Sequence, residues 1–125
     1  ENEAVTGIVK TIKKAGLEKR TEYISFSLNA VKEFIKQAPK GTPVYYLNGE
    51  LAPEELKKMG CAGLDYELNV LKKHPEWIKQ SHELGMKVNV WTVNNEKDMR
   101  WLIGQNVDFI TTNEPVLLQE ILKKN

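Results

Sequence analysis

The segment that decides the fold is Gly85-Met86-Lys87-Val88-Asn89-Val90-Trp91-Thr92-Val93-Asn94. Its side chains alternate in character, as in a β-strand, whose successive residues point to opposite faces. Val88 and Val90 fall on one face, which is suited to packing beneath helices. Asn89 and Trp91 fall on the other face, with the tryptophan near the carboxyl end. A strand covered by helices on both faces usually shows a continuous Val/Ile/Leu run. The pattern therefore favours a (β/α) barrel over an open doubly wound sheet.

Strands and helices alternate along the whole chain. Five strands are expected: Tyr23–Phe26, Val44–Leu47, Gly63–Glu67, Lys87–Val93 and Phe109–Thr111. Hydrophobic periodicity and capping residues predict six helices. The first three run over Val5–Ala15, from the N-cap Ser27 to before Pro39, and from Pro53 to Gly60. The last three run from His74 to Gly85, from the cap Asn94 or Asn95 to Leu102, and from the cap Asn113 onward. Short strands joined by single helices imply parallel pairing through right-handed crossovers.

The chain length predicts an incomplete barrel. Each strand–helix unit takes roughly 20 to 25 residues, and an eightfold barrel at that spacing fills about 200 to 250 residues. The 125 residues here supply only the five units named above. No linker, low-complexity stretch or second domain interrupts them. We therefore predict an α/β fold of parallel (β/α) units, a single domain over residues 1–125 that forms part of a TIM-type barrel.

Composition narrows the classes of function. Lys and Arg total 18 against 17 Asp and Glu, which gives a net charge of +1. Such a balance provides no field to recruit nucleic acid or an anionic membrane. No apolar run approaches the roughly 20 residues that a membrane span needs. The single cysteine, Cys61, excludes an internal disulfide and a Cys-based metal site, and its place before an apolar strand predicts a buried structural thiol.

Two segments together carry a family resemblance. Gly85–Asn94, followed by Val107–Pro115, resembles the last two strands of the glycerophosphodiester phosphodiesterase barrel, which read Gly-x-x-Val-x-x-Trp-Thr-Val-Asn and Val-Asp-x-Ile-x-Thr-x-x-Pro. Ile24–Ser27 is similar to the Ser-Phe strand in the middle of these enzymes. Gly63–Tyr66 and His74–Ile78 look like the third-from-last unit. The resemblance covers nearly the whole chain and implies the C-terminal portion of that barrel, roughly its last five strands.

The resemblance also implies a reaction. Members of the family hydrolyse glycerophosphodiesters to glycerol 3-phosphate and an alcohol, with Mg²⁺ or Ca²⁺ as cofactor. A histidine pair serves as acid and base, and carboxylates hold the cation. The first histidine lies in His-Arg-Gly, and the metal site begins with Glu-x-Asp on the second strand. No expected strand here carries either motif, and His74 and His82 match neither position. We therefore expect no catalytic residue and no metal ligand in this chain, and place both in a missing N-terminal portion.

Three aromatic residues are expected to bind substrate. Trp91 falls near the carboxyl end of its strand, where barrel active sites form, and it matches the family tryptophan that lines the glycerol side of the pocket. Phe26 matches the aromatic residue of the Ser-Phe strand, which borders the same cleft. Tyr66 lies at a similar level on its own strand. For each of the three, packing in the core is the alternative role.

Asp65 and Glu67 put two carboxylates on one face of a strand. That spacing could grip a divalent cation, but it is not the family's Glu-x-Asp. We favour two solvated carboxylates at a strand end, with Lys72 or Lys73 close by.

A second class of function remains open beside the enzyme. A half-barrel has two open sheet edges and an exposed inner face, and both favour association. The chain could therefore be a non-enzymatic interaction module that dimerises or pairs with a separate partner. In the enzyme reading, the partners are the glycerophosphodiester and either the missing N-terminal half or another copy that closes the barrel. The resemblance favours a periplasmic or secreted protein over a cytoplasmic one without deciding the compartment.

Overall fold

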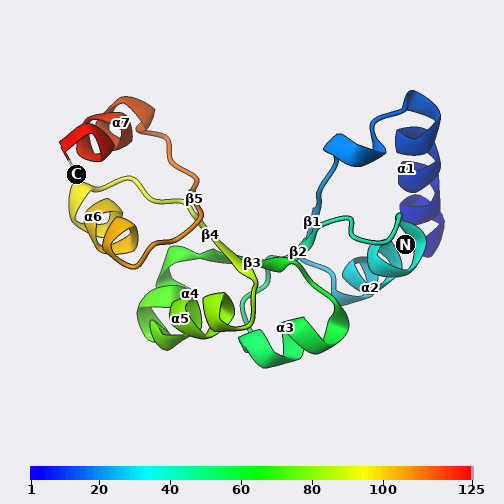
Figure 1. The fold of residues 1–125 in the computed structure, drawn as a ribbon, viewed down its shortest axis with the longest axis horizontal. Coiled ribbons are helices and arrows are strands. Elements are labelled where there is room, and N and C mark those ends of the chain that lie inside the picture. The colour runs from blue at the N-terminus through cyan, green and yellow to red at the C-terminus, as the bar shows by residue number, and fades with distance from the viewer. Residues whose placement is uncertain (125) are drawn as a thin grey trace.

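The computed structural model describes residues 1–124, which form an arc of alternating strands and helices (Figure 1). One parallel sheet has the order β1-β2-β3-β4-β5, so each strand pairs with the next one along the chain. The strands are β1 (Tyr23–Ser25), β2 (Val44–Tyr46), β3 (Gly63–Glu67), β4 (Lys87–Trp91) and β5 (Phe109–Ile110). All five predicted strands are therefore present and parallel, as a section of a barrel wall.

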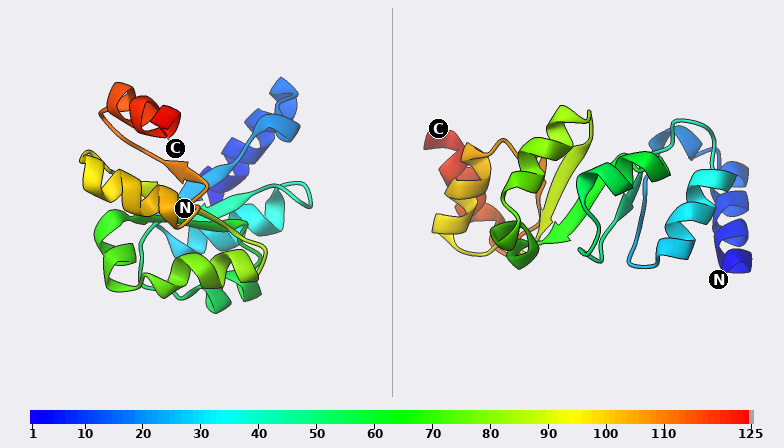
Figure 2. Two further views of the ribbon diagram at one scale, coloured as in Figure 1. Left: turned by 60° about the vertical axis from the view of Figure 1, so that its left-hand side comes forward. Right: turned by 90° about the horizontal axis from the view of Figure 1, so that it is seen from below.

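The helices lie along the outside of this arc (Figures 1 and 2). They are α1 (Asn2–Ala15), α2 (Leu28–Gln37), α3 (Pro53–Met59), α4 (Leu68–Lys73), α5 (Glu76–Glu83), α6 (Glu96–Gly104) and α7 (Pro115–Lys124), with a short 3₁₀ turn over Glu18–Arg20. None of the helices in residues 1–124 has the length and apolar character needed to cross a membrane. The fold is the predicted partial (β/α) barrel.

The two faces of the sheet have different surroundings. Leu64, Val88 and Val90 are fully buried in the core cluster that the helices cover. Residues at the alternate positions face the inside of the arc. There Ile24 keeps 49% of its surface exposed and Phe109 keeps 58%. The alternation read from the sequence thus separates a helix-covered face from an open inner face.

Local capping signals explain most of the helix boundaries. The Ser27 hydroxyl accepts a hydrogen bond from the backbone N–H of Ala30, and the Asn95 side chain accepts one from that of Asp98, as N-caps do. The predicted cap at Asn113 is displaced, since α7 begins at Pro115 and Glu114 directly precedes it. The helix predicted from His74 to Gly85 is α5, and a further short helix, α4, lies between β3 and it. Helix α4 was not expected, because it follows β3 without a linker.

Candidate functional site

Phe26 and Trp91 meet at the carboxyl edge of the sheet. Phe26 directly follows β1, and Trp91 is the last residue of β4. Two strands separate β1 from β4, but the curvature of the sheet brings the rings together across the inner face. The ring centroids are 5.9 Å apart and the rings are perpendicular, a favoured geometry for aromatic pairs. Phe26 remains 57% exposed, so the pair forms an open aromatic corner at the edge where barrel enzymes bind substrates.

The orientation of Trp91 is fixed by a hydrogen bond. Its indole Nε1–H donates to the backbone oxygen of Asp65 on β3, over 2.8 Å. The parallel register of β3 and β4 places Glu67 opposite Trp91 and Asp65 opposite Asn89. Because the polar edge of the indole is satisfied by the neighbouring strand, the remaining ring surface is free to act as an apolar wall.

Tyr66 lies on the other face of β3 and does not join the aromatic corner. Its hydroxyl donates to the backbone oxygen of Leu51 over 2.7 Å, and its ring contacts those of Tyr46 and Trp77. Burial raises the pKa of Tyr66, because the phenolate would be shielded from water. The alternation that turns Asp65 inward turns Tyr66 toward the helices, so the structure does not bring Tyr66 together with Phe26 and Trp91.

The carboxylates of β3 are not the solvated pair that the sequence suggested. Asp65 is buried, with 8% of its surface exposed. Glu67 caps α4, with its two oxygens accepting from the backbone N–H and the side-chain amide of Asn69 over 3.1 and 3.0 Å. Lys72 pairs with Asp98 at 3.0 Å instead of approaching either carboxylate.

These side chains do not fit a divalent cation site. Within residues 1–124, no three His, Cys, Asp or Glu side chains come together as possible metal ligands. The two histidines have other contacts: His74 stacks on Trp77 with a centroid distance of 4.0 Å, and His82 Nε2 lies 3.0 Å from Asp108 Oδ2.

Asn94 has a role that the sequence analysis did not assign. Its Oδ1 accepts from the Thr112 hydroxyl over 3.2 Å and from the backbone N–H of Asn113 over 2.8 Å. It thereby joins the loop after β4 to the loop after β5, beside the aromatic corner. Its position in the Trp-Thr-Val-Asn motif was visible in the sequence, but its partners lie 18 and 19 residues away.

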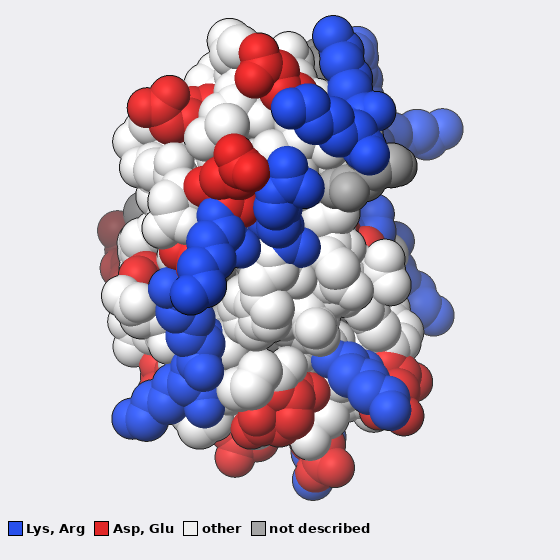
Figure 3. All heavy atoms as spheres, turned by 90° about the vertical axis from the view of Figure 1, so that its left-hand side faces the viewer, with Lys and Arg blue, Asp and Glu red and all other residues white. Residues whose placement is uncertain are grey.

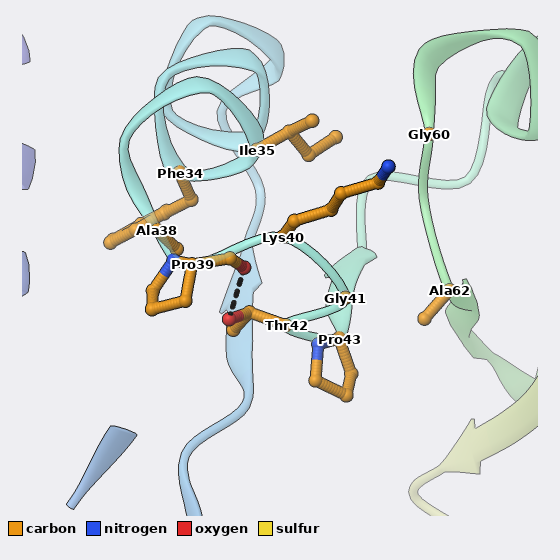
Figure 4. Close-up of a pocket in the computed structure, with 10 residues that line it drawn as sticks. All are labelled: Phe34, Ile35, Ala38, Pro39, Lys40, Gly41, Thr42, Pro43, Gly60 and Ala62. Carbon is orange, nitrogen blue, oxygen red and sulfur yellow. Dashed lines mark hydrogen bonds between the residues drawn. The ribbon is translucent and has the colours of Figure 1, made fainter. Parts of the chain in front are cut away.

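A cavity elsewhere in the fold has a different character. It has a volume of about 360 Å³ and lies at the opposite, amino-terminal edge of the sheet (Figure 4). Its lining is formed by Phe34, Ile35, Ala38, Pro39, Lys40, Gly41, Thr42, Pro43, Gly60 and Ala62. The Thr42 hydroxyl donates to the Pro39 backbone oxygen over 2.7 Å and closes the turn. Apolar and proline-rich walls at this edge point to loop packing.

The face that carries α6 and α7 presents a run of basic side chains with acidic side chains next to it (Figure 3). Uncharged surface lies between them. This mixture agrees with the net charge of +1 and leaves the aromatic corner as the candidate site.

Parallel strands, outer helices and an aromatic corner at the carboxyl edge define a chain of the (β/α)-barrel class. The chain belongs to the glycerophosphoryl diester phosphodiesterase family, whose model matches residues 1–117. A glycerophosphodiester phosphodiesterase from Caldanaerobacter subterraneus subsp. tengcongensis is 28% identical over 120 residues, which cover 94% of this chain and 48% of the relative.

Solved structures show the same likeness. A glycerophosphodiester phosphodiesterase from Parabacteroides distasonis has 50% identity and a TM-score of 0.93, over 98% of this chain and 51% of its own. A putative glycerophosphoryl diester phosphodiesterase from Silicibacter pomeroyi has 29% identity and a TM-score of 0.85, over 98% and 44%. The chain therefore spans about half the length of the relatives that it matches.

Proposed function

We propose that this chain forms the C-terminal, five-strand portion of a glycerophosphodiester phosphodiesterase and supplies a wall of its substrate pocket. The complete enzyme would convert a glycerophosphodiester and water to glycerol 3-phosphate and an alcohol. The observation that carries the proposal is the perpendicular pair of Phe26 and Trp91 at the carboxyl edge of the sheet. Family membership and the names of the relatives support the reaction.

The wall would act by positioning the substrate. With its N–H bonded to Asp65, the Trp91 ring offers a fixed apolar surface to the carbon skeleton of the glycerol group. Phe26 extends that surface at right angles, so the two rings together restrict where the glycerol can lie. Holding a substrate in a reactive orientation lowers the entropic part of the barrier.

The chemical groups of the reaction would come from the N-terminal portion. That portion would carry the histidine pair and the carboxylates for Mg²⁺ or Ca²⁺, since residues 1–124 provide no such ligand set. The cation, when bound, would neutralise negative charge on the phosphate. This chain's own contribution is then binding and orientation, and alone it would be inactive.

The test uses a joined chain, in which residues 1–125 follow the part of the Parabacteroides distasonis protein that they do not match. We expect metal-dependent release of glycerol 3-phosphate from glycerophosphocholine, lost with EDTA. Trp91→Ala should then raise KM by about tenfold or more, the effect of losing about 1.4 kcal/mol of binding. Trp101→Phe, on α6, is the control and should leave KM unchanged. An unchanged KM in Trp91→Ala would remove the pocket role of Trp91.

The interaction module is the second candidate, and the exposed inner face favours it. Ile24, Phe26 and Phe109 each keep about half of their surface exposed, at 49%, 57% and 58%. Light scattering of the isolated chain tests this reading. If residues 1–125 form a stable dimer and the joined chain folds but is inactive, the function of this chain is that of an interaction module and not that of part of an enzyme.

A further inference from the structure

The carboxylate of Asp65 has no partner in the described chain. Asp65 is 8% exposed, and its Oδ1 is enclosed without accepting a hydrogen bond from any of residues 1–124. None of the ion pairs among these residues includes it. Burial raises the pKa of Asp65, because the charged form is shielded from water. Buried carboxylates in folded proteins are normally paired, so this one calls for a partner from elsewhere.

Asn89, beside Asp65, also has a buried side-chain oxygen without a hydrogen-bond donor in residues 1–124. The β3–β4 register makes Asp65 and Asn89 direct neighbours on the inner face, on strands that lie about 4.8 Å apart. Asn89 is also 8% exposed, and its Oδ1 is likewise enclosed and unpaired within residues 1–124. Two adjacent acceptor oxygens without donors require N–H or O–H groups, and the carboxylate favours a positively charged donor.

The nearest basic side chain on this face points elsewhere. Lys87 begins β4 on the same face as Asn89, but its Nζ lies over the ring of Phe109, 5.9 Å from the centroid. Glu67, the other charged group of β3, is engaged by Asn69. Tyr45 also faces inward; burial raises its pKa most, and the negative charges of Glu22, Asp108 and Asp65 raise it further. Within residues 1–124, no basic side chain forms an ion pair with Asp65 on this face.

The same face carries the exposed apolar residues Ile24 on β1 and Phe109 on β5, and the arc of strands is open on its concave side (Figure 1). The relatives are about twice as long as this chain. We propose that a Lys or Arg side chain of the polypeptide that covers this face in the complete barrel inserts into it and donates its N–H groups to Asp65 and Asn89. The inference rests on the proposed function, and it adds a basic residue of the covering segment as the partner.

The isolated chain provides the first test, with small cations as probes. Methylguanidinium and n-butylammonium reproduce the ends of Arg and Lys. Each should shift the carboxyl ¹³C resonance of Asp65 saturably and lower its titration midpoint by about one pH unit, the effect of an adjacent opposite charge. Tetramethylammonium, which has the charge but no N–H, and sodium should not. The shift should disappear in Asp65→Asn and persist in Glu67→Gln, the matched control whose carboxylate is already bonded.

The direction in which Asp65→Asn changes Tm provides the second test. In the isolated chain at pH 7, Asp65→Asn should raise Tm by about 3 to 6 °C, because it removes an unpaired buried charge. In the joined chain the same substitution should lower Tm, because there it leaves the inserted cation without its counter-charge. Glu67→Gln should change Tm little and equally in both. Far-UV circular dichroism and the combined fluorescence of the three tryptophans report whether each variant is folded.

The outcomes separate this inference from the proposed function. If neither methylguanidinium nor n-butylammonium shifts the carboxyl ¹³C resonance of Asp65, the carboxylate is satisfied within the chain and the proposal is overturned. A joined chain that hydrolyses glycerophosphocholine, but is stabilised by Asp65→Asn, would also overturn it while leaving the proposed function intact. If the joined chain does not fold, the probe cations on the isolated chain decide the matter alone.

Discussion

Gly63→Ala should separate β3 from β4 and so disorder the site. A Cβ added to Gly63 would lie 2.1 Å from the backbone oxygen of Lys87 and 2.9 Å from its backbone carbon and nitrogen. No side-chain rotation relieves a clash with backbone atoms, so the strands must part. The hydrogen bond from the Lys87 N–H to the Ala62 oxygen, 3.0 Å long, lies at the same point of the ladder.

The expected loss follows from these contacts. Overpacking costs about 1 to 3 kcal/mol, and one or two weakened ladder hydrogen bonds add about 1 kcal/mol each. Gly63→Ala should therefore lower the free energy of unfolding by about 2 to 5 kcal/mol, a large part of the roughly 5 to 15 kcal/mol that typically stabilises a domain. In urea unfolding followed by tryptophan fluorescence, the midpoint should fall by about 2 M.

The control uses glycines with open space around them. Gly7 in α1 and Gly104 in α6 have no heavy atom within 4 Å of an added Cβ. Alanine at Gly7 should stabilise by up to about 1 kcal/mol, because glycine is a poor helix former. The free energy of one ordinary hydrogen bond is about 1 kcal/mol. If the free energy of unfolding of Gly63→Ala lies within that amount of the original protein's, β3 and β4 do not approach so closely. The placement of Trp91 against Asp65 would then be refuted as well.

Three further predictions concern single groups. Trp91→Phe replaces the indole with a smaller phenyl ring and loses the bond to the Asp65 oxygen, so urea unfolding should show a loss of about 1 kcal/mol or more; no loss would contradict that bond. Burial raises the pKa of the Cys61 thiol from 9.0 to about 11, so at pH 8 its thiolate fraction, and its reaction with a disulfide reagent, should be about a hundredfold below an ordinary thiol; equal rates in folded and urea-unfolded chain would refute burial. Burial acts to raise the pKa of Glu50, but hydrogen bonds from Tyr46, its own backbone and Asn48 outweigh it and leave the pKa lowered from 4.5. This carboxylate therefore stabilises the fold above pH 4.5, and the contribution is lost as the pH falls through the lowered folded-state pKa. Acid titrations of Glu50→Gln should lack that loss, and a titration that matches the original chain would contradict it.

The sequence predicted the strands because alternation is a local signal. Val88 and Val90 on one face and Asn89 on the other required only the period of a strand. Ser27 and Asn95 as N-caps required only short-range patterns. The partial barrel followed from the strand–helix spacing, and the family followed from the Trp-Thr-Val-Asn segment.

The features that the sequence did not predict depend on contacts between distant parts of the chain, or on the face of the sheet where a residue lies. The contact of Phe26 with Trp91 depends on the curvature of the sheet, which no local pattern contains. Asp65 keeps only 8% of its surface exposed although the inner face is open. This burial arises from contacts beyond its own strand, so it could not be read from a position at a strand end. The face of Tyr66 does follow from a local pattern, because the period of two in a strand puts neighbouring residues Asp65 and Tyr66 on opposite faces.

The central claim is that this chain shapes the pocket and that the reacting groups lie elsewhere. The most direct measurement is release of glycerol 3-phosphate from glycerophosphocholine by residues 1–125 alone, with Mg²⁺ or Ca²⁺ and an EDTA control. We expect no release from this chain and metal-dependent release from the joined chain. Metal-dependent release by residues 1–125 alone would contradict it and would assign the reaction to carboxylates of this chain, beginning with Asp65 and Glu67.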